Sequence, residues 1–420
     1  MTNKPTRIGT ASPRTKRRLV TTVALSGLAA LTLAFFWKIA LTNRMLAGLD
    51  LFAYFYPLRD FASEALREGR LPLWNPYLFM GAPFLANSQV AVLYPLHWPL
   101  VWLSAPKQIA WSIVLHIWIA GSGTYLFARN ALRLNPLPAL VPAIVFALGG
   151  FLGAQVEHIN QLNASVWLPW LLLCLEGSLA TCRWRWLWLL VGCAVVGLLL
   201  LAGHTQAAYI VLAASAGYAV LLGILARGPW RKARRLRRLM PLGFLALMAG
   251  PGLALAAGQL LPTYELSHLS VRSGGLSYRE AVAFSLKPAL VFKAFLPPLL
   301  WEPPLSEYVA YIGLVGLCLA LFGARTIVRR WHGARQDGVT LPRGTRRATA
   351  ILTMAIVGVL LAFGVYNPLY YLLYKLVPGF DLFRVPARWL LLYGFGASLL
   401  AGIGLQSLEL SRPWKWALVF

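Results

Sequence analysis

Residues 13–50 read PRTKRRLVTTVALSGLAALTLAFFWKIALTNRMLAGLD, and this stretch decides the class of fold. Four of its first six residues are Lys or Arg, and the next 23 residues, 19–41, hold a single charge, Lys38. A run of about 20 apolar residues is long enough to cross the roughly 30 Å of hydrocarbon in a bilayer. The stretch therefore predicts a membrane-spanning helix with a basic segment before it and Asp50 shortly after it.

Similar apolar runs recur along all 420 residues, of which 59% are hydrophobic and only 12% charged. Hydropathy predicts ten spans, at residues 19–41, 108–128, 137–154, 164–181, 186–203, 206–226, 239–261, 308–325, 348–366 and 388–408. We expect an all-α polytopic membrane protein of about ten to eleven transmembrane helices. The abrupt apolar tail at 411–420 is either a C-terminal tail or the start of a further helix.

Charge sets the expected orientation. The net charge of +26 would suggest nucleic acid in a soluble protein, but here Lys and Arg gather in short loops between apolar runs. With the N-terminus inside, 26 of the 39 Lys and Arg fall on the inner side, as in cytoplasmic loops of membrane proteins. The expected location is the cytoplasmic (inner) cell membrane, in contact with membrane lipids and with no nucleic-acid partner.

The outer side carries the chemistry in this topology, because ten of the thirteen acidic residues fall there. Residues 1–18 form a cytoplasmic N-terminus, residues 19–410 the transmembrane domain, and the first helix is expected to stay uncleaved. The outer loops at 42–107 and 262–307 are long and rich in Pro, Trp and Tyr. Glu265, Glu302 and Glu307 lie in the second of these loops and are candidates to shape the acceptor side, although their spacing does not decide it.

Several reaction classes lack their motifs. The sequence has no P-loop, no GxGxxG and no HExxH. The four cysteines, Cys174, Cys182, Cys193 and Cys318, lack metal-ligand spacing and are expected to be small buried hydrophobic residues. No cofactor is expected, a divalent metal being left open, and the energy must come with the substrate or from an ion gradient.

Asp50 is the candidate catalytic residue. Its neighbours are Leu49 and Leu51, and no basic residue lies closer in sequence than Arg44. A carboxylate at the boundary between water and lipid is suited to take a proton from an attacking hydroxyl. The alternative is that Asp50 simply caps the helix that follows.

An amphipathic helix is expected from about residue 58 to Gly69. Its apolar face comprises Leu58, Phe61, Ala62, Ala65 and Leu66, and its polar face comprises Arg59, Asp60, Ser63, Glu64 and Arg67. This pattern predicts a helix that lies along the membrane surface. The acids are spaced as a solvated face with Arg partners, and the competing role for Asp60 is substrate binding.

Residues 71–103 contain five prolines, which exclude one long helix. Their Trp and Tyr residues are either an interfacial aromatic belt or a rigid wall against which a sugar ring or a polyprenyl chain packs. In the second interpretation Trp74 contributes to the wall, and Asn75 and Gln89 hydrogen-bond to hydroxyl groups.

Asp50 with Tyr54 to Pro57, GRLPLWNP at 69–76, GAP at 81–83 and Tyr94-Pro95 resemble the first outer loop of YfhO-type bacterial membrane proteins. That family is placed in the GT-C superfamily of glycosyltransferases. Further stretches that resemble it are LAGHTQAAY at 201–209, QLLPTYELSHLSVRSGGLSY at 259–278 and DLFRVPARWLLLYGFGASLLAGIGL at 381–405. The resemblance therefore runs across almost the whole chain.

The resemblance implies a GT-C-like bundle that moves a sugar from a polyprenyl-phosphate carrier to an envelope polymer, lipid or protein on the outer face of the membrane. It also implies an acidic catalytic base in the first outer loop, which by motif position is Asp50. Many relatives have a tandem acidic pair there, whereas this chain has Leu51 next. Single displacement would invert the anomeric carbon.

A lipid phosphate that leaves in such a reaction needs cations, and Arg holds two phosphate oxygens at once. Arg384 and Arg388 flank Pro386 before the last span, and Arg272 stands in a Ser- and Gly-rich stretch. The alternatives are an Asp381–Arg384 ion pair and a snorkelling Arg388.

Two further polar groups lie close to lipid: His204 with Gln206, and Glu157 with His158. Polar groups in such places usually line a cavity, although a histidine hydrogen-bonded within the bundle is the common alternative for His204. Adjacent residues rarely bind one ion, so Glu157 and His158 predict no metal site. Two competing functions remain: a transporter or flippase of lipid-linked sugars, and a non-catalytic scaffold of envelope assembly.

Overall fold

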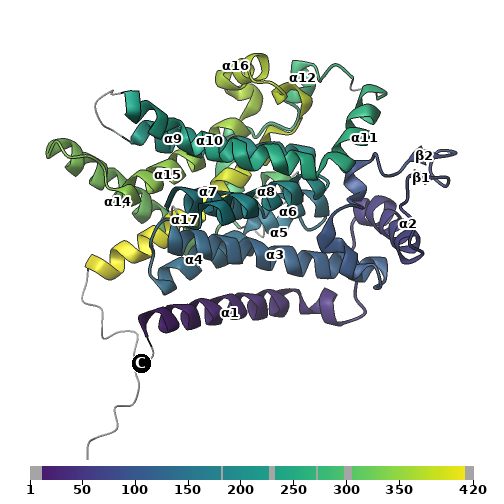
Figure 1. Cartoon of the computed structure of the whole chain (residues 1–420), viewed down its shortest axis with the longest axis horizontal. Helices are drawn as coiled ribbons and strands as arrows, with labels where there is room; N and C mark the ends of the chain where they lie inside the picture. Colours follow the sequence, from purple (N-terminus) through teal and green to yellow (C-terminus); the bar gives the residue numbers. More distant parts are fainter. Residues whose placement is uncertain (1–11, 181–182, 227–231, 271–272, 298–304, 412–420) are drawn as a thin grey trace, which may run out of the picture.

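The computed structural model describes residues 12–180, 183–226, 232–270, 273–297 and 305–411. The chain forms a bundle of helices whose axes follow the long dimension of the molecule (Figure 1). The long helices are α1 (Pro13–Leu41), α3 (Ala105–Asn130), α4 (Pro136–Ala147), α7 (Leu168–Ala180), α8 (Arg185–Leu201), α9 (Thr205–Leu225), α10 (Lys232–Leu255), α14 (Leu314–Gln336), α15 (Arg343–Ala362) and α17 (Leu390–Ser411).

Shorter elements fill the connections. They are η1 (Leu51–Phe55), α2 (Tyr56–Arg67), β1 (Trp74–Asn75), β2 (Ala82–Pro83), η2 (Ser88–Val90), η3 (Pro95–Leu100), α5 (Gly150–Ala154), α6 (Ile159–Ser165), α11 (Ala257–His268), α12 (Tyr278–Ala281), η4 (Pro288–Leu290), α13 (Val291–Phe295), η6 (Ser306–Tyr308), η7 (Gly364–Tyr366), α16 (Pro368–Leu376), η8 (Phe380–Leu382) and η9 (Pro386–Trp389). The two short strands pair antiparallel, Trp74 with Pro83 and Asn75 with Ala82.

The prediction of an all-α membrane protein is confirmed. Among the described residues, eight helices are long and apolar enough to cross a membrane. The two remaining predicted spans are α8, which has 17 residues, and α14, whose second half carries Arg325, Arg329 and Arg330. Within the predicted span 308–325 the α-helix starts only at Leu314, because residues 309–313 are not helical.

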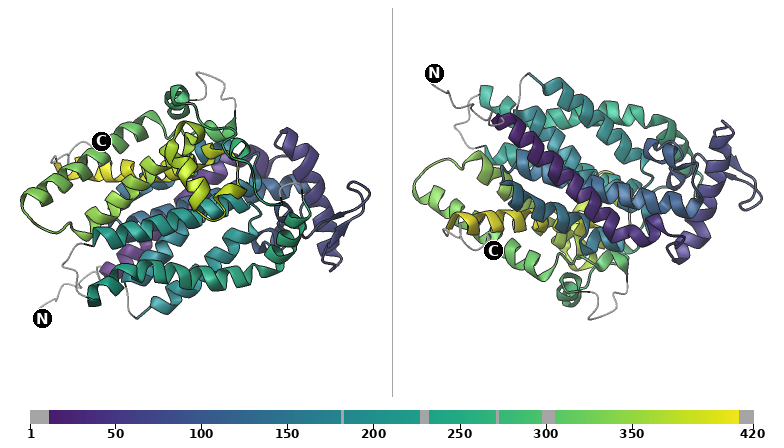
Figure 2. Two further views of the ribbon diagram at one scale, coloured as in Figure 1. Left: turned by 90° about the horizontal axis from the view of Figure 1, so that it is seen from above. Right: turned by 90° about the horizontal axis from the view of Figure 1, so that it is seen from below.

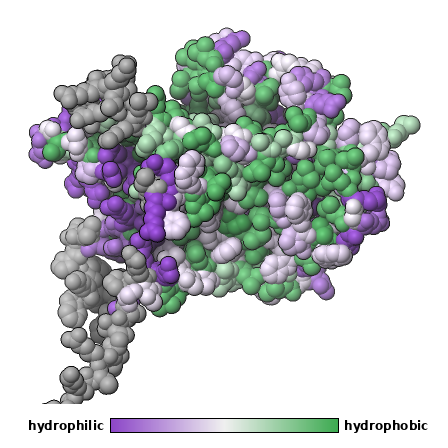
Figure 3. Space-filling view, in the orientation of Figure 1, coloured by the Kyte–Doolittle hydropathy of each residue, from purple (hydrophilic) through white to green (hydrophobic). Residues whose placement is uncertain are grey.

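Polar and apolar surfaces are arranged as a membrane requires. Hydrophobic residues cover the middle of the molecule, and hydrophilic ones gather toward the end with the α14–α15 turn and around α2 (Figure 3). Helix α1 begins and α17 ends at the α14–α15 end, whereas α2 and the hairpin lie at the other (Figures 1 and 2). Which end faces the cytoplasm stays a prediction from the charge pattern.

The spans that include α3, α7 and α17 are the most fully buried of the candidate membrane helices. Close approach of α14 to α17 depends on small residues, since a Cβ added to Gly404 would lie 2.0 Å from the Leu319 carbonyl oxygen. Small residues at such crossings let helix backbones touch, which is how membrane helices commonly pack. Helix α1 lies at the side of the bundle, and from Thr15 to Leu41 its buried residues are Ala24, Leu28, Thr32 and Ala40.

A helix break brings a distant segment into the site. The predicted span 137–154 is split into α4 and α5, and the Gly150 N–H donates to the Tyr311 carbonyl oxygen at 2.7 Å. A Cβ added to Gly150 would lie 2.9 Å from the Tyr311 nitrogen, so only glycine admits this approach. The segment before α14 therefore reaches the turn between α5 and α6, and it carries Ser306 and Glu307.

Three expectations are corrected. Arg59 and Ser63 were placed on the solvated face of the first-loop helix, yet both are buried. Cys318 was expected to be buried and is exposed, while Cys174 and Cys193 are buried as expected and all three are free thiols. Cys182 and the tail at 412–420 lie outside the described residues, as does the start of the N-terminal segment.

Candidate functional site

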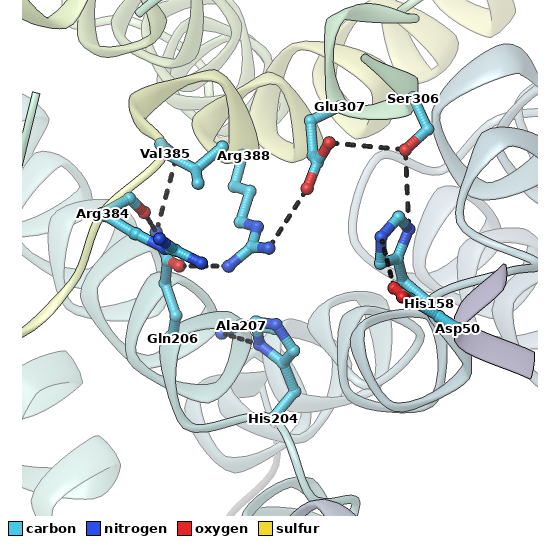
Figure 4. Close-up of polar contacts among 10 residues, drawn as sticks. All are labelled: Asp50, His158, His204, Gln206, Ala207, Ser306, Glu307, Arg384, Val385 and Arg388. Atoms are coloured by element: carbon cyan, nitrogen blue, oxygen red, sulfur yellow. Dashed lines mark hydrogen bonds and ion pairs between the residues drawn. The ribbon is translucent and has the colours of Figure 1, made fainter. Parts of the chain in front are cut away.

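A cavity of about 630 Å³ lies where η1, the α5–α6 turn, the α8–α9 turn and the segment before α17 meet. Seven of the twelve predicted site residues line it: Asp50, Gln89, His158, His204, Gln206, Arg384 and Arg388. A volume of this size is in the range of small-molecule sites, which are about 300–1,000 Å³. Figure 4 shows Asp50 and His158 on one side of the cavity and Arg384 and Arg388 on the other.

Asp50 is presented to the cavity by a rigid support. It directly precedes η1, in which Leu51 and Phe55 are buried, and the Tyr56 hydroxyl donates to the Leu46 carbonyl oxygen at 2.8 Å. The Asp50 side chain makes no capping hydrogen bond and is 59% exposed. The helix-cap alternative is therefore wrong, and the carboxylate is free for an incoming group.

A chain of polar contacts runs from Asp50 across the cavity (Figure 4). His158 Nε2 lies 3.7 Å from Asp50 Oδ2, and His158 Nδ1 lies 3.5 Å from Ser306 Oγ. Ser306 Oγ donates to Glu307 Oε2 at 3.3 Å, and Glu307 Oε1 lies 3.1 Å from Arg388 Nη2. The contacts link four chain segments, so the positions of these side chains depend on one another.

Arg388 is directed into the bundle. Its Nη1 donates to Gln206 Oε1 at 2.6 Å, its side chain is 18% exposed, and its buried Nε has no hydrogen-bond partner. The snorkelling alternative for Arg388 is therefore wrong. Arg384 is exposed and lines the cavity, and the described residues form no Asp381–Arg384 ion pair. Both arginines can therefore offer donors to an anion in the cavity.

Two residues of the cavity wall have strained backbones. Val385, between Arg384 and Pro386, has φ 64°, and Phe284 has φ 61°. A bulky residue in the left-handed region costs of order 1–3 kcal/mol and tends to occur at functional sites. The Gln206 amide donates to the carbonyl oxygens of Arg384 and Val385, which holds this backbone in place.

His204 is the N-cap of α9. Its Nδ1 accepts a hydrogen bond from the Ala207 N–H at 3.0 Å. Burial, together with the nearby Arg388 guanidinium and the His158 ring, lowers the pKa of His204 to about 3. The imidazole is therefore neutral at physiological pH, and its ring faces the cavity without adding charge.

His204→Asn is expected to make the melting temperature fall less steeply as the pH is lowered. The pKa of His204 is low in the folded protein and ordinary in the unfolded chain, so stability is complete above about pH 6.5 and falls toward pH 3. The loss stays below about 1.4 kcal/mol per pH unit for one proton. Asn retains the cap without titrating. Melting temperatures measured from pH 8 to pH 4 check this; a slope equal to that of the exposed-site control His268→Asn would contradict it.

Amide side chains form the floor of the cavity beside His158. The Asn160 side-chain amide donates to the backbone carbonyl oxygen of Gln89. Gln89 therefore holds Asn160 in place through its backbone. Both side-chain polar atoms of Gln161 are buried without a partner, as is Asn160 Oδ1. Buried polar atoms of this kind are normally satisfied by water or ligand, and both residues belong to the lining of the cavity.

Five predicted residues are not brought to the cavity. Asp60 is exposed on α2, and Trp74 covers Gly81 within the hairpin. Asn75 is buried, and its Oδ1 accepts from the Tyr77 N–H at 2.9 Å, which makes it a turn residue. Glu157 points to Gly48, whose added Cβ would lie 3.3 Å from Glu157 Cδ. Arg272 lies outside the described residues.

Residues outside the predicted set of site residues also join the site. Ser306 and Glu307 complete the polar chain, although nothing in their spacing indicated it. Tyr54 lines the cavity and accepts a hydrogen bond from Asn87 Nδ2 at 2.7 Å. Burial raises the pKa of Tyr54, so its hydroxyl stays protonated. The aromatic cluster around Tyr54 in the sequence was the available signal.

A second polar cluster fixes the first loop to the bundle. Arg59 Nη1 lies 2.8 Å from His97 Nδ1, and Asn163 Nδ2 lies 3.2 Å from His97 Nε2. Burial lowers the pKa of Arg59 to about 10 and that of His97 well below 6.5, so at neutral pH a charged arginine contacts a neutral histidine. Because α2 follows η1 directly, this contact also holds Asp50 in position.

Metal binding was left open by the sequence. Within the part of the chain that the structure describes, no group of three or more His, Cys, Asp or Glu side chains is placed to hold a metal ion. Comparison of the chain with protein-family models and with curated proteins finds no match.

Proposed function

We propose that this protein is a GT-C-like membrane glycosyltransferase that moves a sugar from a polyprenyl-phosphate-linked donor to a hydroxyl acceptor on the outer face of the cytoplasmic membrane. The observation that carries the proposal is the cavity itself, which places an exposed carboxylate opposite two arginines. Glycosyl transfer from a lipid phosphate needs both: a base for the acceptor and positive charge for the leaving group.

Asp50 acts as the general base. One of its carboxylate oxygens takes the proton of the acceptor hydroxyl while the acceptor oxygen forms a bond to the anomeric carbon. The bond between that carbon and the phosphate oxygen breaks, and its electron pair leaves with the polyprenyl phosphate. A single displacement of this kind inverts the anomeric carbon, and the energy comes from the donor.

Arg384 and Arg388 bind the phosphate. Arg388 has an unpartnered buried Nε, and Arg384 reaches the cavity from the preceding turn. Charge-assisted bonds from guanidinium groups strengthen as charge develops on the leaving phosphate. Glu307 limits the positive charge when no phosphate is bound, since it pairs with Arg388 at 3.1 Å.

His158 and Ser306 orient the base. His158 lies between Asp50 and Ser306, and Ser306 in turn bonds to Glu307. These contacts take the place of the tandem acidic pair that the resemblance implies. Leu51, the residue after Asp50, is buried, and the second carboxylate of the site is Glu307, which comes from another loop. Gln161 and Asn160 are placed to bind sugar or acceptor hydroxyls.

The partners follow from this chemistry. The donor is a polyprenyl-phosphate-linked sugar, the acceptor is an envelope polymer, lipid or protein, and membrane lipids surround the bundle. The hairpin with Trp74 and the exposed helix face with Asp60 lie away from the cavity. The hairpin is therefore available to a large acceptor rather than to the donor.

A deletion strain tests the function without knowledge of the sugar. Envelope glycans compared by mass spectrometry should lose one hexose or amino-sugar mass on deletion and regain it on complementation with the wild-type chain. The lipid-linked donor should accumulate in the deletion strain on the outer leaflet. Accumulation on the inner leaflet instead would support the transporter hypothesis, and unchanged glycans with unchanged donor lipid would refute transfer.

A further inference from the structure

A dense group of arginines lies at the α14–α15 end of the molecule. Residues 325–347 contain seven arginines and a single acidic residue, Asp337. They form the second half of α14, the turn after it and the beginning of α15. This turn lies at the end of the bundle away from α2, where hydrophilic residues gather (Figures 1 and 3). The proposed transfer reaction uses none of these arginines.

The outward face of α14 changes from apolar to cationic along the helix. Its buried side is formed by Gly316, Ala320, Gly323 and Ile327. The exposed residues recur three or four positions apart and therefore share one face: Cys318, Leu321, Phe322, Arg325, Val328, Arg329 and His332. Helix α14 has no charged residue before Arg325. A face of this kind lies against lipid tails as far as Phe322 and meets the lipid headgroups from Arg325 on.

Packing contacts place Arg325 at the boundary of the membrane. Helices α14 and α17 both run toward the α14–α15 end (Figure 1), and a Cβ added to Gly323 would lie 3.1 Å from the Gly404 nitrogen. A Cβ added to Gly402 of α17 would lie 2.6 Å from the Pro138 carbonyl oxygen, near the start of α4. Arg325 lies two residues, about 3 Å, beyond Gly323. It is therefore level with the place where α4 enters its candidate membrane span.

Arg325 and Arg329 lie side by side on this face. They are four residues apart on one helix, which puts their Cβ atoms about 6 Å from each other. Within the described ranges, no acidic side chain forms an ion pair with either of them. Arg347 differs, because its Nη2 pairs with the buried Glu176 at 2.5 Å. Among the described residues, therefore, Arg347 has a counter-ion and the two exposed arginines have none.

We propose that Arg325 and Arg329 bind the phosphate of an anionic phospholipid, whose acyl chains lie along Leu321 and Phe322. Arginine holds two phosphate oxygens at once, and two arginines one turn apart can share one headgroup. The excess of arginine over acid in 325–347 favours a net negative headgroup over zwitterionic phosphatidylcholine. The apolar residues directly before the pair favour a lipid over a soluble polyanion such as a nucleic acid. This site is independent of the proposed function.

Two double variants test the site. Arg325→Gln/Arg329→Gln removes the pair, and the control Arg335→Gln/Arg343→Gln removes the same charge from exposed positions beside the turn. Arg335 lies ten residues, about 15 Å, beyond Arg325 on α14, so it does not reach a headgroup bound at the pair. Gln has nearly the helix propensity of Arg, so both variants should keep their helices.

The measurement is native mass spectrometry of the full chain, titrated in detergent with dioleoyl phosphatidylglycerol. We expect the pair variant to bind this lipid about 25-fold more weakly than the wild type, since each arginine near an anionic headgroup contributes roughly fivefold. The control variant should bind like the wild type, and inorganic phosphate should not displace the lipid.

Three results would overturn the proposal: equal weakening in both double variants, equal affinity of the wild type for dioleoyl phosphatidylcholine, and displacement of the lipid by inorganic phosphate. The first would assign the effect to net charge, and the third to a soluble anion. If the pair variant has a lower melting temperature than the control, photolabelling of the wild type decides instead. Phosphatidylglycerol with a diazirine on its headgroup should label residues 325–332 of α14, and labelling confined to other helices would refute the site.

Discussion

Asp50→Asn is expected to lower the rate of sugar transfer by about 10²- to 10⁴-fold while the KM for the donor stays nearly unchanged. A general base contributes an effect of this size, and the amide cannot take the proton of the acceptor. Asn matches Asp in shape, and the carboxylate makes no capping bond that it could lose. The stability of the protein should therefore be unaffected.

The measurement is initial-rate transfer by purified protein, with glycan mass spectrometry of complemented deletion strains at equal protein levels. Asp60→Asn is the matched control, because Asp60 is an exposed acid of the same loop and does not line the cavity. It should retain the wild-type rate. Full activity of Asp50→Asn would exclude Asp50 as the base and would support the transporter or the scaffold hypothesis instead.

Arg388→Gln is expected to slow transfer strongly and also to destabilise the protein. Glu307 is buried, and Arg388 is its ion-pair partner at 3.1 Å. Removing one partner leaves a buried charge uncompensated, at a cost of about 3–5 kcal/mol. Loss of a group that stabilises charge on a leaving phosphate lowers kcat by about 10²- to 10³-fold.

The double variant Arg388→Gln/Glu307→Gln separates these two effects. With both charges removed, the melting temperature in detergent should return close to that of the wild type, whereas transfer should stay low. Arg70→Gln is the control for a surface pair, since Arg70 and Glu68 are 66% and 51% exposed and such pairs contribute about 0–1 kcal/mol. Recovery of transfer in the double variant would show that Arg388 is purely structural.

Some errors of sequence interpretation have a clear physical cause. Arg59 was assigned to a solvated face because helical periodicity separates charged from apolar residues. Its buried partner, His97, lies 38 positions away, and such a pairing leaves no periodic signal. On residue type, Trp74 was a candidate for a binding wall and Asn75 for hydrogen bonds to hydroxyl groups. The local β1–β2 pairing and an Asn turn use both residues instead.

The sequence by itself determined the helical membrane bundle and the charge pattern along it. Both are local properties, since a window of about 20 apolar residues is decided by its own hydrophobicity. It also indicated which polar residues lie close to lipid, including His158, His204 and Arg388. Such residues stand out in a sequence because burying a polar group near lipid is costly at any position.

Only the tertiary structure decided which of these residues form one site. Asp50 and Arg388 are far apart in the chain, and the segment with Ser306 and Glu307 reaches His158 because the glycine break between α4 and α5 lets Tyr311 approach. Contacts between distant segments depend on how helices pack, and packing is set by side-chain shape at every crossing. No short stretch of sequence contains that information.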